Sequence, residues 1–373
     1  MSETPISSPP RRGCLVAPLG PPGPGFPVRS TRPQPAGPSG SFGARRELTI
    51  FAHTPVMEPE ITAIFGPVPP GFVIDATVGG GGHSRALLEA RPDLHLVGLD
   101  QDADALAASA DRLAGFSTRV TLRQARFDQL RQVVDELGYT TVTGVLFDLG
   151  VSSPQLDRAD RGFSYRSAGP LDMRMDQRQS LRADDIVNTY DQAEIARILR
   201  ELGDERFAGR IARAIVANRP VGSTVDLAAI VRDAIPAPAR RTGGHPAKRT
   251  FQALRIEVNH ELDILGSAID QAIDVLVPGG RLAVLAYHSG EDRIVKQRLQ
   301  DAAAGGEAPP PGVPIRAGEE GTSPRLRLLK RGAWKPSATE IERNPRSESA
   351  RLRAAEKLAE LGAGPGAPSG RAA

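Results

Sequence analysis

The sequence predicts an α/β fold with a mostly parallel sheet that is interrupted by an inserted helical domain. Short apolar segments typical of buried strands alternate with helical segments, as they do in βαβ units. The first of these strands leads directly into four consecutive glycines, Gly79–Gly82. Two later strands are separated by far more chain than one crossover helix needs. These three observations favour a ligand-binding sheet domain that carries a second, helical unit.

Four expected strands and two expected helices define the sheet domain. Each strand is a short apolar run, and three of the four end at an aspartate. The strands are Phe72–Asp75, Leu94–Asp100, Val145–Asp148 and Arg281–Tyr287. The helices are Ser84–Ala90, directly after the glycines, and the alanine-rich segment Ala103–Leu113. We assign residues 46–159 and 246–357 to this domain.

Residues 160–245 are expected to form the inserted helical domain, which would recognise the substrate. Asp191 and Glu194 match a capping box at the start of one helix. Ser223 has the same capping role before a second helix, which Pro236 would end.

One long amphipathic helix is expected to lead from the insert back to the sheet, because apolar residues between Phe251 and Leu276 recur every three or four positions. The two ends of the chain, 1–45 and 358–373, have a different character and are rich in proline and glycine. Such segments bury too little apolar surface to offset the entropy lost on ordering, so we expect both to be disordered.

The composition excludes several classes of protein. The 373 residues include 47 Lys+Arg and 44 Asp+Glu, so the net charge of +3 indicates a polyanionic partner only weakly. Cys14 is the only cysteine, which excludes an intramolecular disulfide, a cysteine-based zinc site and an iron–sulfur cluster. No apolar run approaches the roughly 18 residues that span a bilayer. A cytoplasmic protein without a membrane partner is expected.

The glycine cluster is expected to hold a nucleoside cofactor. Glycines let the backbone approach a ligand closely, and Asp100 at the end of the second strand could accept both hydroxyls of an adenosine ribose. The G-x-G-x-x-G dinucleotide fingerprint and the G-K-[ST] ending of a phosphate-binding loop are both missing. A cofactor without a pyrophosphate, S-adenosyl-L-methionine (AdoMet), therefore fits best. A glycine-rich turn that binds nothing is the alternative.

Several longer motifs resemble one family, the bacterial ribosomal RNA small-subunit methyltransferase H (MraW) family. They are HTPVM at 53–57, DATVGGGGHS at 75–84, FDLGVSSPQLD at 147–157, RGFSYRSAGPLDMRMD at 161–176, GDERFAGRIARAIV at 203–216, HPAKRTFQALRIEVNHEL at 245–262, YHSGEDRIVK at 287–296 and NPRSESARLRAAEK at 344–357. The resemblance implies a Rossmann-like class I methyltransferase that uses AdoMet.

The same resemblance implies a reaction and a partner. The reaction is methyl transfer to the exocyclic N4 of a cytidine in 16S ribosomal RNA, at the decoding region of the small ribosomal subunit. Two alternatives remain open: an amino-methyltransferase acting on another RNA or on DNA, and a non-catalytic RNA-binding assembly factor that keeps the fold.

The resemblance also assigns cofactor contacts to particular positions. They are Gly81, Gly82, His83, Asp100, Phe127, Asp148 and Gln155. Asp100 would bind the ribose and Phe127 the adenine face, with Asp148 and Gln155 near the methionine end. The chain departs from the family at Gly290, where a large aliphatic residue is usual, and this puts the rigidity of that loop in doubt.

Asp148 and His288 are the candidate catalytic residues. Each ends a strand at the edge where open α/β sheets bind their ligands. His288 could accept a proton from the amine, or could equally satisfy the loop backbone. An aromatic residue is needed to stack on the base, and the candidates are Phe163, Tyr165 and Tyr287. No two histidines have metal-ligand spacing, so no metal is expected.

Three basic segments, at 158–178, 240–256 and 324–357, are expected to contact RNA phosphates. The candidate residues are Arg161, Arg166, Arg174, Lys248, Arg249, Arg346 and Arg351. Asp172 and Asp176 flank Arg174 and could either pair locally with basic neighbours or face the substrate.

Overall fold

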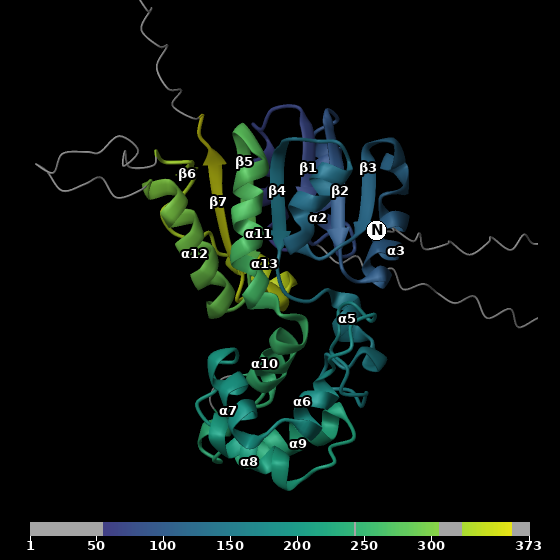
Figure 1. Ribbon diagram of the computed structural model, residues 1–373, viewed down its shortest axis with the longest axis vertical. Coiled ribbons are helices and arrows are strands. Elements are labelled where there is room, and N and C mark those ends of the chain that lie inside the picture. The colour runs from purple at the N-terminus through teal and green to yellow at the C-terminus, as the bar shows by residue number, and fades with distance from the viewer. Residues whose placement is uncertain (1–54, 242–243, 306–322, 360–373) are drawn as a thin grey trace, which may run out of the picture. The chain divides into compact units, whose positions relative to one another are not determined.

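A computed structural model describes residues 55–241, 244–305 and 323–359 of the chain (Figure 1). The expected disordered segment at 1–45 lies outside the described residues, as does most of the one at 358–373. None of the described helices is long and apolar enough to cross a membrane.

A seven-stranded sheet forms the larger part of the fold, with the strand order β3-β2-β1-β4-β5-β7-β6. The strands are β1 (Gly71–Asp75), β2 (Leu94–Asp100), β3 (Val120–Gln124), β4 (Val142–Asp148), β5 (Leu276–Ala286), β6 (Leu326–Leu328) and β7 (Arg351–Lys357). The first five are parallel, whereas β7 pairs antiparallel with both β5 and β6. The four expected strands are therefore present, and β3, β6 and β7 are additions.

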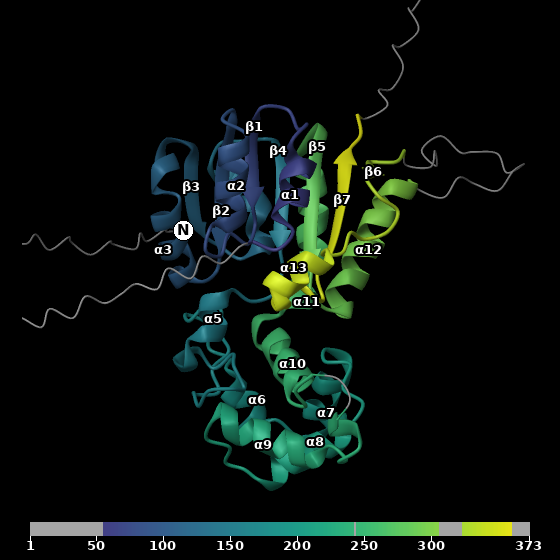
Figure 2. The same cartoon turned by 180° about the vertical axis from the view of Figure 1, so that it is seen from behind.

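Helices cover both faces of the sheet (Figures 1 and 2). One core lies between the sheet and the apolar sides of α4 (Leu130–Glu136), α11 (Glu261–Val275) and α12 (Ser289–Ala304). The opposite core contains residues of α1 (Glu58–Phe65) and α2 (Gly82–Ala90). Two further helices are α3 (Ala103–Arg112), which follows β2, and α13 (Ala338–Arg343), which lies between β6 and β7 in the chain. Because both faces are covered, the central parallel strands β2, β1, β4 and β5 are largely buried and read as nearly continuous apolar runs.

The helical insert has a separate apolar core. Its helices are α5 (Ser153–Asp157), α6 (Ala183–Thr189), α7 (Gln192–Glu201), α8 (Ala208–Ala217), α9 (Thr224–Ala234) and α10 (Lys248–Asn259). The two expected N-caps are confirmed, since Asp191 accepts a hydrogen bond from the backbone N–H of Glu194, and Ser223 from that of Asp226. The α9 helix ends two residues before Pro236, as its missing N–H requires.

The prediction of one long helix between Phe251 and Leu276 is wrong. His260 adopts a left-handed backbone (φ 53°) that ends α10 and begins α11. The apolar face of α10, including Phe251 and Leu254, packs into the core of the insert. The insert therefore continues to Asn259, beyond the boundary expected at residue 245, because α10 completes its core.

The parallel register brings the ends of the strands together at one edge. Asp75 is aligned with Gly98 of β2 and with Leu146 of β4, two residues before Asp100 and Asp148 respectively. Asp148 is in turn aligned with Leu285 of β5. The carboxylates predicted from the sequence therefore lie at the same edge of the sheet as Tyr287, which follows β5.

Candidate active site

The glycine loop between β1 and α2 is shaped by close packing. Gly81 caps α2 in a left-handed conformation (φ 72°), and a Cβ there would lie 3.2 Å from Ser109 of α3. At Gly82 a Cβ would lie 2.6 Å from the ring of Pro55. By contrast, a Cβ on Gly80 would meet no described atom within 4 Å. Two of the glycines are thus required by packing, and a third leaves open space beside the strand ends.

Asp100 joins this loop to the turn after β2. Its Oδ2 accepts a 2.9 Å hydrogen bond from the backbone N–H of Gly79, and its Oδ1 accepts one of 2.9 Å from the N–H of Asp102. Burial raises the pKa of Asp100 to about 7, against the lowering effect of these two bonds. The carboxylate is held in one orientation and still has lone pairs for hydroxyl donors.

Asp75 is a buried structural partner of the same loop. Its Oδ2 accepts a 2.6 Å hydrogen bond from the hydroxyl of Ser84, in the first turn of α2. Burial raises the pKa of Asp75 to about 6, although the bond from Ser84 and the nearby His83 both act to lower it. Asp75 therefore fixes the start of α2 relative to β1.

Asp148 is the more accessible carboxylate, with 30% of its side chain exposed. Its Oδ1 accepts a 2.7 Å hydrogen bond from the hydroxyl of Tyr287, and its Oδ2 lies 3.5 Å from Nε2 of His83. Its backbone N–H donates a 2.6 Å bond to the hydroxyl of Thr77, in the loop after β1. Burial and the Asp148 carboxylate both raise the pKa of Tyr287 well above its usual value, so the phenol remains a donor.

His83 is buried, and neither of its ring nitrogens has a hydrogen-bond partner among the described residues. The 3.5 Å separation from Asp148 is an ion-pair distance without hydrogen-bond geometry. Burial opposes protonation, but the carboxylates of Asp148 and Asp75 outweigh it and raise the pKa of His83. Buried polar atoms without partners are rare in proteins. The imidazole of His83 is therefore held by burial and by its charge interaction with Asp148.

Two other residues assigned to the cofactor are placed differently. The ring of Phe127 is largely buried and meets Phe147 edge to face, with 6.0 Å between the ring centroids. The amide of Gln155 is buried and bonded at both ends, since it donates to Asp102 and accepts from the N–H of Ser152. Gln155 thus holds the loop after β4 in this structure, and its contact with a cofactor stays a prediction.

His288 begins α12 as its N-cap. Its Nδ1 accepts a 3.4 Å hydrogen bond from the N–H of Glu291, and its Nε2 lies 3.1 Å from Oε1 of the same residue. Burial opposes ionisation of Glu291, but His288 holds its pKa below the usual range. A Cβ on Gly290 would lie 3.1 Å from the His288 ring. Glycine at this position, where the family usually has a large aliphatic residue, therefore leaves space for the ring. This capping contact is the hydrogen bonding to loop backbone that we expected of His288 as the alternative to catalysis. Its catalytic role stays a prediction.

Of the three aromatic candidates, Tyr287 is the one that contacts Asp148. Phe163 is buried in the core of the insert, where it is a packing residue. Tyr165 stacks on His245, with ring centroids 4.3 Å apart, and meets Phe251 edge to face.

Two of the residues predicted to contact RNA have side chains that are paired within the protein, and their contact with RNA stays a prediction. Arg161 is 3% exposed and is ion-paired with Asp102 and Asp104. Arg174 is 12% exposed and is paired with Asp172 through two 2.8 Å hydrogen bonds. Asp176 likewise pairs with Arg178, so both aspartates beside Arg174 make local ion pairs.

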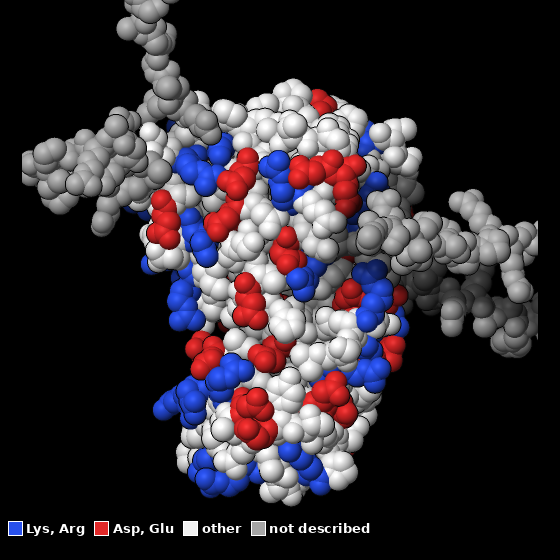
Figure 3. Space-filling model, viewed as in Figure 1, with Lys and Arg blue, Asp and Glu red and all other residues white. Residues whose placement is uncertain are grey.

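The other predicted contacts lie on the surface. Arg166, Lys248, Arg249 and Arg351 are exposed. Arg346 is exposed as well and is paired with Asp157 at 2.9 Å. On the face seen in Figure 3, the basic side chains alternate with acidic ones and are frequent along the edge where α12 and β6 lie.

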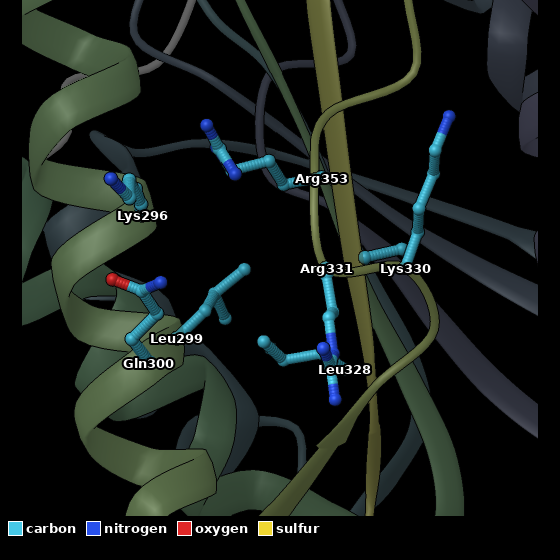
Figure 4. Close-up of a pocket in the computed structure, with 8 residues that line it drawn as sticks. Lys296, Leu299, Gln300, Leu328, Lys330, Arg331 and Arg353 are labelled. Atoms are coloured by element: carbon cyan, nitrogen blue, oxygen red, sulfur yellow. The ribbon is translucent and has the colours of Figure 1, made fainter.

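A small hollow lies at that edge, between α12 and the β6–β7 pair (Figure 4). Lys296, Lys330, Arg331 and Arg353 surround it, above a floor that includes Leu299 and Leu328. Arg353 is already neutralised by Asp292 of α12, at 2.7 Å. The hollow does not include the strand-end carboxylates and is therefore separate from the candidate active site.

Sequence reasoning missed Asp102, Thr77 and Glu291, which hold the site together. Asp102 caps α3 by accepting a hydrogen bond from Asp104, and an aspartate just before a helix is a signal that could have revealed it. The described residues contain no group of three or more His, Cys, Asp or Glu that could hold a metal ion.

A doubly wound sheet of this order, with one antiparallel strand inserted beside β5 and with carboxylates around a glycine loop, defines a class I methyltransferase fold. The family model described as "MraW methylase family" matches residues 50–358. The chain therefore belongs to the MraW methylase family, as the motifs predicted.

Relatives share about half of their residues with this chain. A "Ribosomal RNA small subunit methyltransferase H" from Frankia casuarinae is 56% identical over 292 residues, which cover 77% of this chain and 90% of the relative. A protein of the same name from Thermobifida fusca is 51% identical over 83% of this chain and 94% of its own length. An rRNA methylase structure from Streptococcus thermophilus has a TM-score of 0.35 and 12% identity, over 81% of this chain and 94% of that one.

Proposed function

We propose that this methyltransferase transfers a methyl group from AdoMet to the exocyclic N4 of a cytidine in 16S ribosomal RNA, at the decoding region. The observation that carries the proposal is the group of strand-end carboxylates around the glycine loop, with the buried ring of His83 paired with Asp148 beside them. The names of the relatives support ribosomal RNA as the substrate.

The residues present fit AdoMet. Asp100, held by the backbone N–H groups of Gly79 and Asp102, has lone pairs left to accept the ribose hydroxyls. The space at Gly80 admits a ligand close to the backbone. Near the methionine end, Asp148 offers an accessible carboxylate, with the buried ring of His83 3.5 Å from its Oδ2. Phe127 would lie against the adenine.

The chemical difficulty is the nucleophile, because the lone pair of the cytosine amine is delocalised into the ring. When bound, AdoMet supplies an electrophilic methyl group on a sulfonium centre. The protein must orient the amine and accept its hydrogens as positive charge develops. Asp148 suits this task, since Tyr287 fixes one carboxylate oxygen while the other lies 3.5 Å from His83 and the side chain is 30% exposed. His288 is the second candidate acceptor.

The RNA would be held by exposed basic side chains around the candidate site. Arg351 on β7 is aligned with Ala286, directly before Tyr287, so it lies at the same edge of the sheet as Asp148. Such cations neutralise phosphates without reading sequence, and specificity would come from the extruded base and the shape of the RNA.

A methyl-transfer assay with tritiated AdoMet tests the proposal against its alternatives. The substrates are small ribosomal subunits, naked ribosomal RNA and duplex DNA, followed by nucleoside analysis of the product. We expect N4-methylcytidine in ribosomal RNA. Label in DNA would favour a DNA methyltransferase, and RNA binding without any transfer would favour an assembly factor.

A further inference from the structure

Arg161 lies in the short helical turn after α5 and makes contacts to two parts of the protein. Its side chain is 3% exposed. One guanidinium nitrogen donates a 2.9 Å hydrogen bond to Oδ2 of Asp102, and the other a 3.1 Å bond to Asp104, at the start of α3. Removing a buried partner of this kind leaves an uncompensated charge, so the pair is energetically important.

Asp102 connects Arg161 to the candidate cofactor site. Its backbone N–H donates the 2.9 Å bond that orients Oδ1 of Asp100, the proposed ribose ligand. Its Oδ2 receives Gln155 at 2.8 Å as well as Arg161. Asp102 is therefore held by side chains from the insert and itself holds Asp100. The chain of contacts from Arg161 to Asp100 involves only one intervening residue.

Arg161 also contacts a loop of the insert, residues 173–175, that lies within the motif at 161–176. The nitrogen that binds Asp102 donates to the backbone carbonyls of Arg174 (3.0 Å) and Met175 (3.3 Å). The side chain of Asn259, at the end of α10, accepts a hydrogen bond from the N–H of Met175 and donates one to the carbonyl of Met173. One guanidinium thus connects the turn beside Asp100 to a loop that is fixed to the end of the insert.

We propose that Arg161 is a positioning residue that couples the cofactor site to the helical insert. It acts through Asp102, so that the geometry of Asp100 and the position of loop 173–175 depend on each other. A ligand held on Asp100 then stabilises this loop. The cofactor strengthens the binding of RNA to the insert, and RNA strengthens the binding of the cofactor by the same factor. The proposal rests on the assignment of Asp100 to the cofactor under the proposed function.

The decisive experiment is a double-mutant cycle on AdoMet affinity, measured by calorimetry on full-length protein. We expect Arg161→Met and Asp102→Asn each to weaken AdoMet binding about tenfold, within the usual range of couplings between sites. The double variant should be no weaker than either single one, because both remove the same connection. Arg161→Lys, which keeps the charge, should recover part of the loss. Arg281→Met is the matched control, because this partly buried arginine pairs with Glu356 and contacts neither Asp102 nor loop 173–175; a change below about twofold is expected.

Hydrogen exchange in residues 171–176 provides a readout that a purely structural role would not move. In the wild-type protein AdoMet should slow this exchange, whereas in folded Arg161→Met it should not. If Arg161→Met does not fold, the effect of AdoMet on hydrogen exchange is compared between the wild type and the Arg161→Lys and Asp102→Asn variants. Folded variants with wild-type affinity, or additive losses in the cycle, would overturn the coupling. A wild-type protein that does not bind AdoMet would instead refute the proposed function.

Discussion

The hydroxyl of Tyr287 donates a 2.7 Å hydrogen bond to Oδ1 of Asp148, and so connects the ends of two neighbouring strands, β4 and β5. The bond leaves Oδ2 of Asp148 facing His83 and partly open to solvent. A carboxylate fixed through one oxygen keeps the other in a constant direction without reorganisation during the reaction. This relationship is the basis of the first prediction.

Replacing Tyr287 by Phe should lower the rate of methyl transfer in single turnover by roughly tenfold, as expected for the loss of a hydrogen bond to a charged group. AdoMet affinity should change little, because Asp148 retains its charge. Asp148→Asn should instead give a mixed result, with a raised KM for AdoMet and a lowered kcat, since we assign this carboxylate both to the cofactor and to the amine. Tyr139→Phe, at a tyrosine stacked on Phe72, is the control. Equal rates for Tyr287→Phe and the wild type would exclude the role of the hydroxyl.

Asp100→Asn should weaken AdoMet binding by about 10- to 100-fold, because it removes charge-assisted hydrogen bonds to the ribose. Calorimetric titration measures this directly. Asp93→Asn is a suitable control, since Asp93 directly precedes β2 and pairs with Arg91. Unchanged affinity in Asp100→Asn would remove Asp100 from the cofactor site.

The stability of the unliganded protein should fall as the pH rises through about 6 to 7. Burial raises the pKa of Asp75 to about 6 and that of Asp100 to about 7, from 3.8. The folded state then binds more protons than the unfolded state in this range, so the free energy of unfolding decreases with pH. Asp100→Asn removes one titrating group and should flatten the decline. Urea denaturation between about pH 5 and pH 8 tests this, and parallel curves for the two proteins would contradict it.

His288 offers a way to separate catalysis from capping. Asn is a good N-cap residue and can replace the contact to the N–H of Glu291, whereas Ala cannot. If His288 accepts the amine proton, both His288→Asn and His288→Ala should lose methyl transfer at saturating AdoMet while retaining cofactor affinity. Near-wild-type transfer by His288→Asn would assign His288 to the helix cap alone. The loop backbone and water would then be the acceptors.

The basic hollow of Figure 4 should contribute to RNA binding. Lys330 and Arg331 form no ion pair with any other described residue, so they are available to phosphates. Lys330→Gln with Arg331→Gln should make the slope of log affinity against log salt concentration less negative by about 1.5. The control is Arg298→Gln with Arg325→Gln, which removes the same charge from residues paired with Asp270 and Asp274. Equal slopes for the two double variants would exclude the hollow.

The sequence alone was sufficient for the strands and helices that carry a strong local pattern. The apolar runs ending at Asp75, Asp100 and Asp148 are strands because burial on both faces requires continuous apolar residues. The cap at Asp191 is local as well, since it involves residues three apart. These features also located the candidate active site, because parallel strands end at the same edge of a sheet.

Elements without such a pattern could not be predicted. Val120–Gln124 is a half-exposed edge strand without an apolar run, and Arg351–Lys357 has a polar sequence in which only some residues are buried. The break at His260 was invisible because apolar residues keep the helical period across it. Pairing partners, rather than the residues themselves, determine these elements.

The sequence by itself determined the methyltransferase fold, the glycine loop and the residue types at the ends of its strands. Only the tertiary structure decided what individual charges do. Arg161 and Arg351 are the same residue type in basic segments, yet the first is buried against Asp102 and the second is exposed. The physical reason is that burial and pairing depend on partners distant in the chain, 59 positions away for the Arg161 contact with Asp102, and no local pattern encodes such a distance.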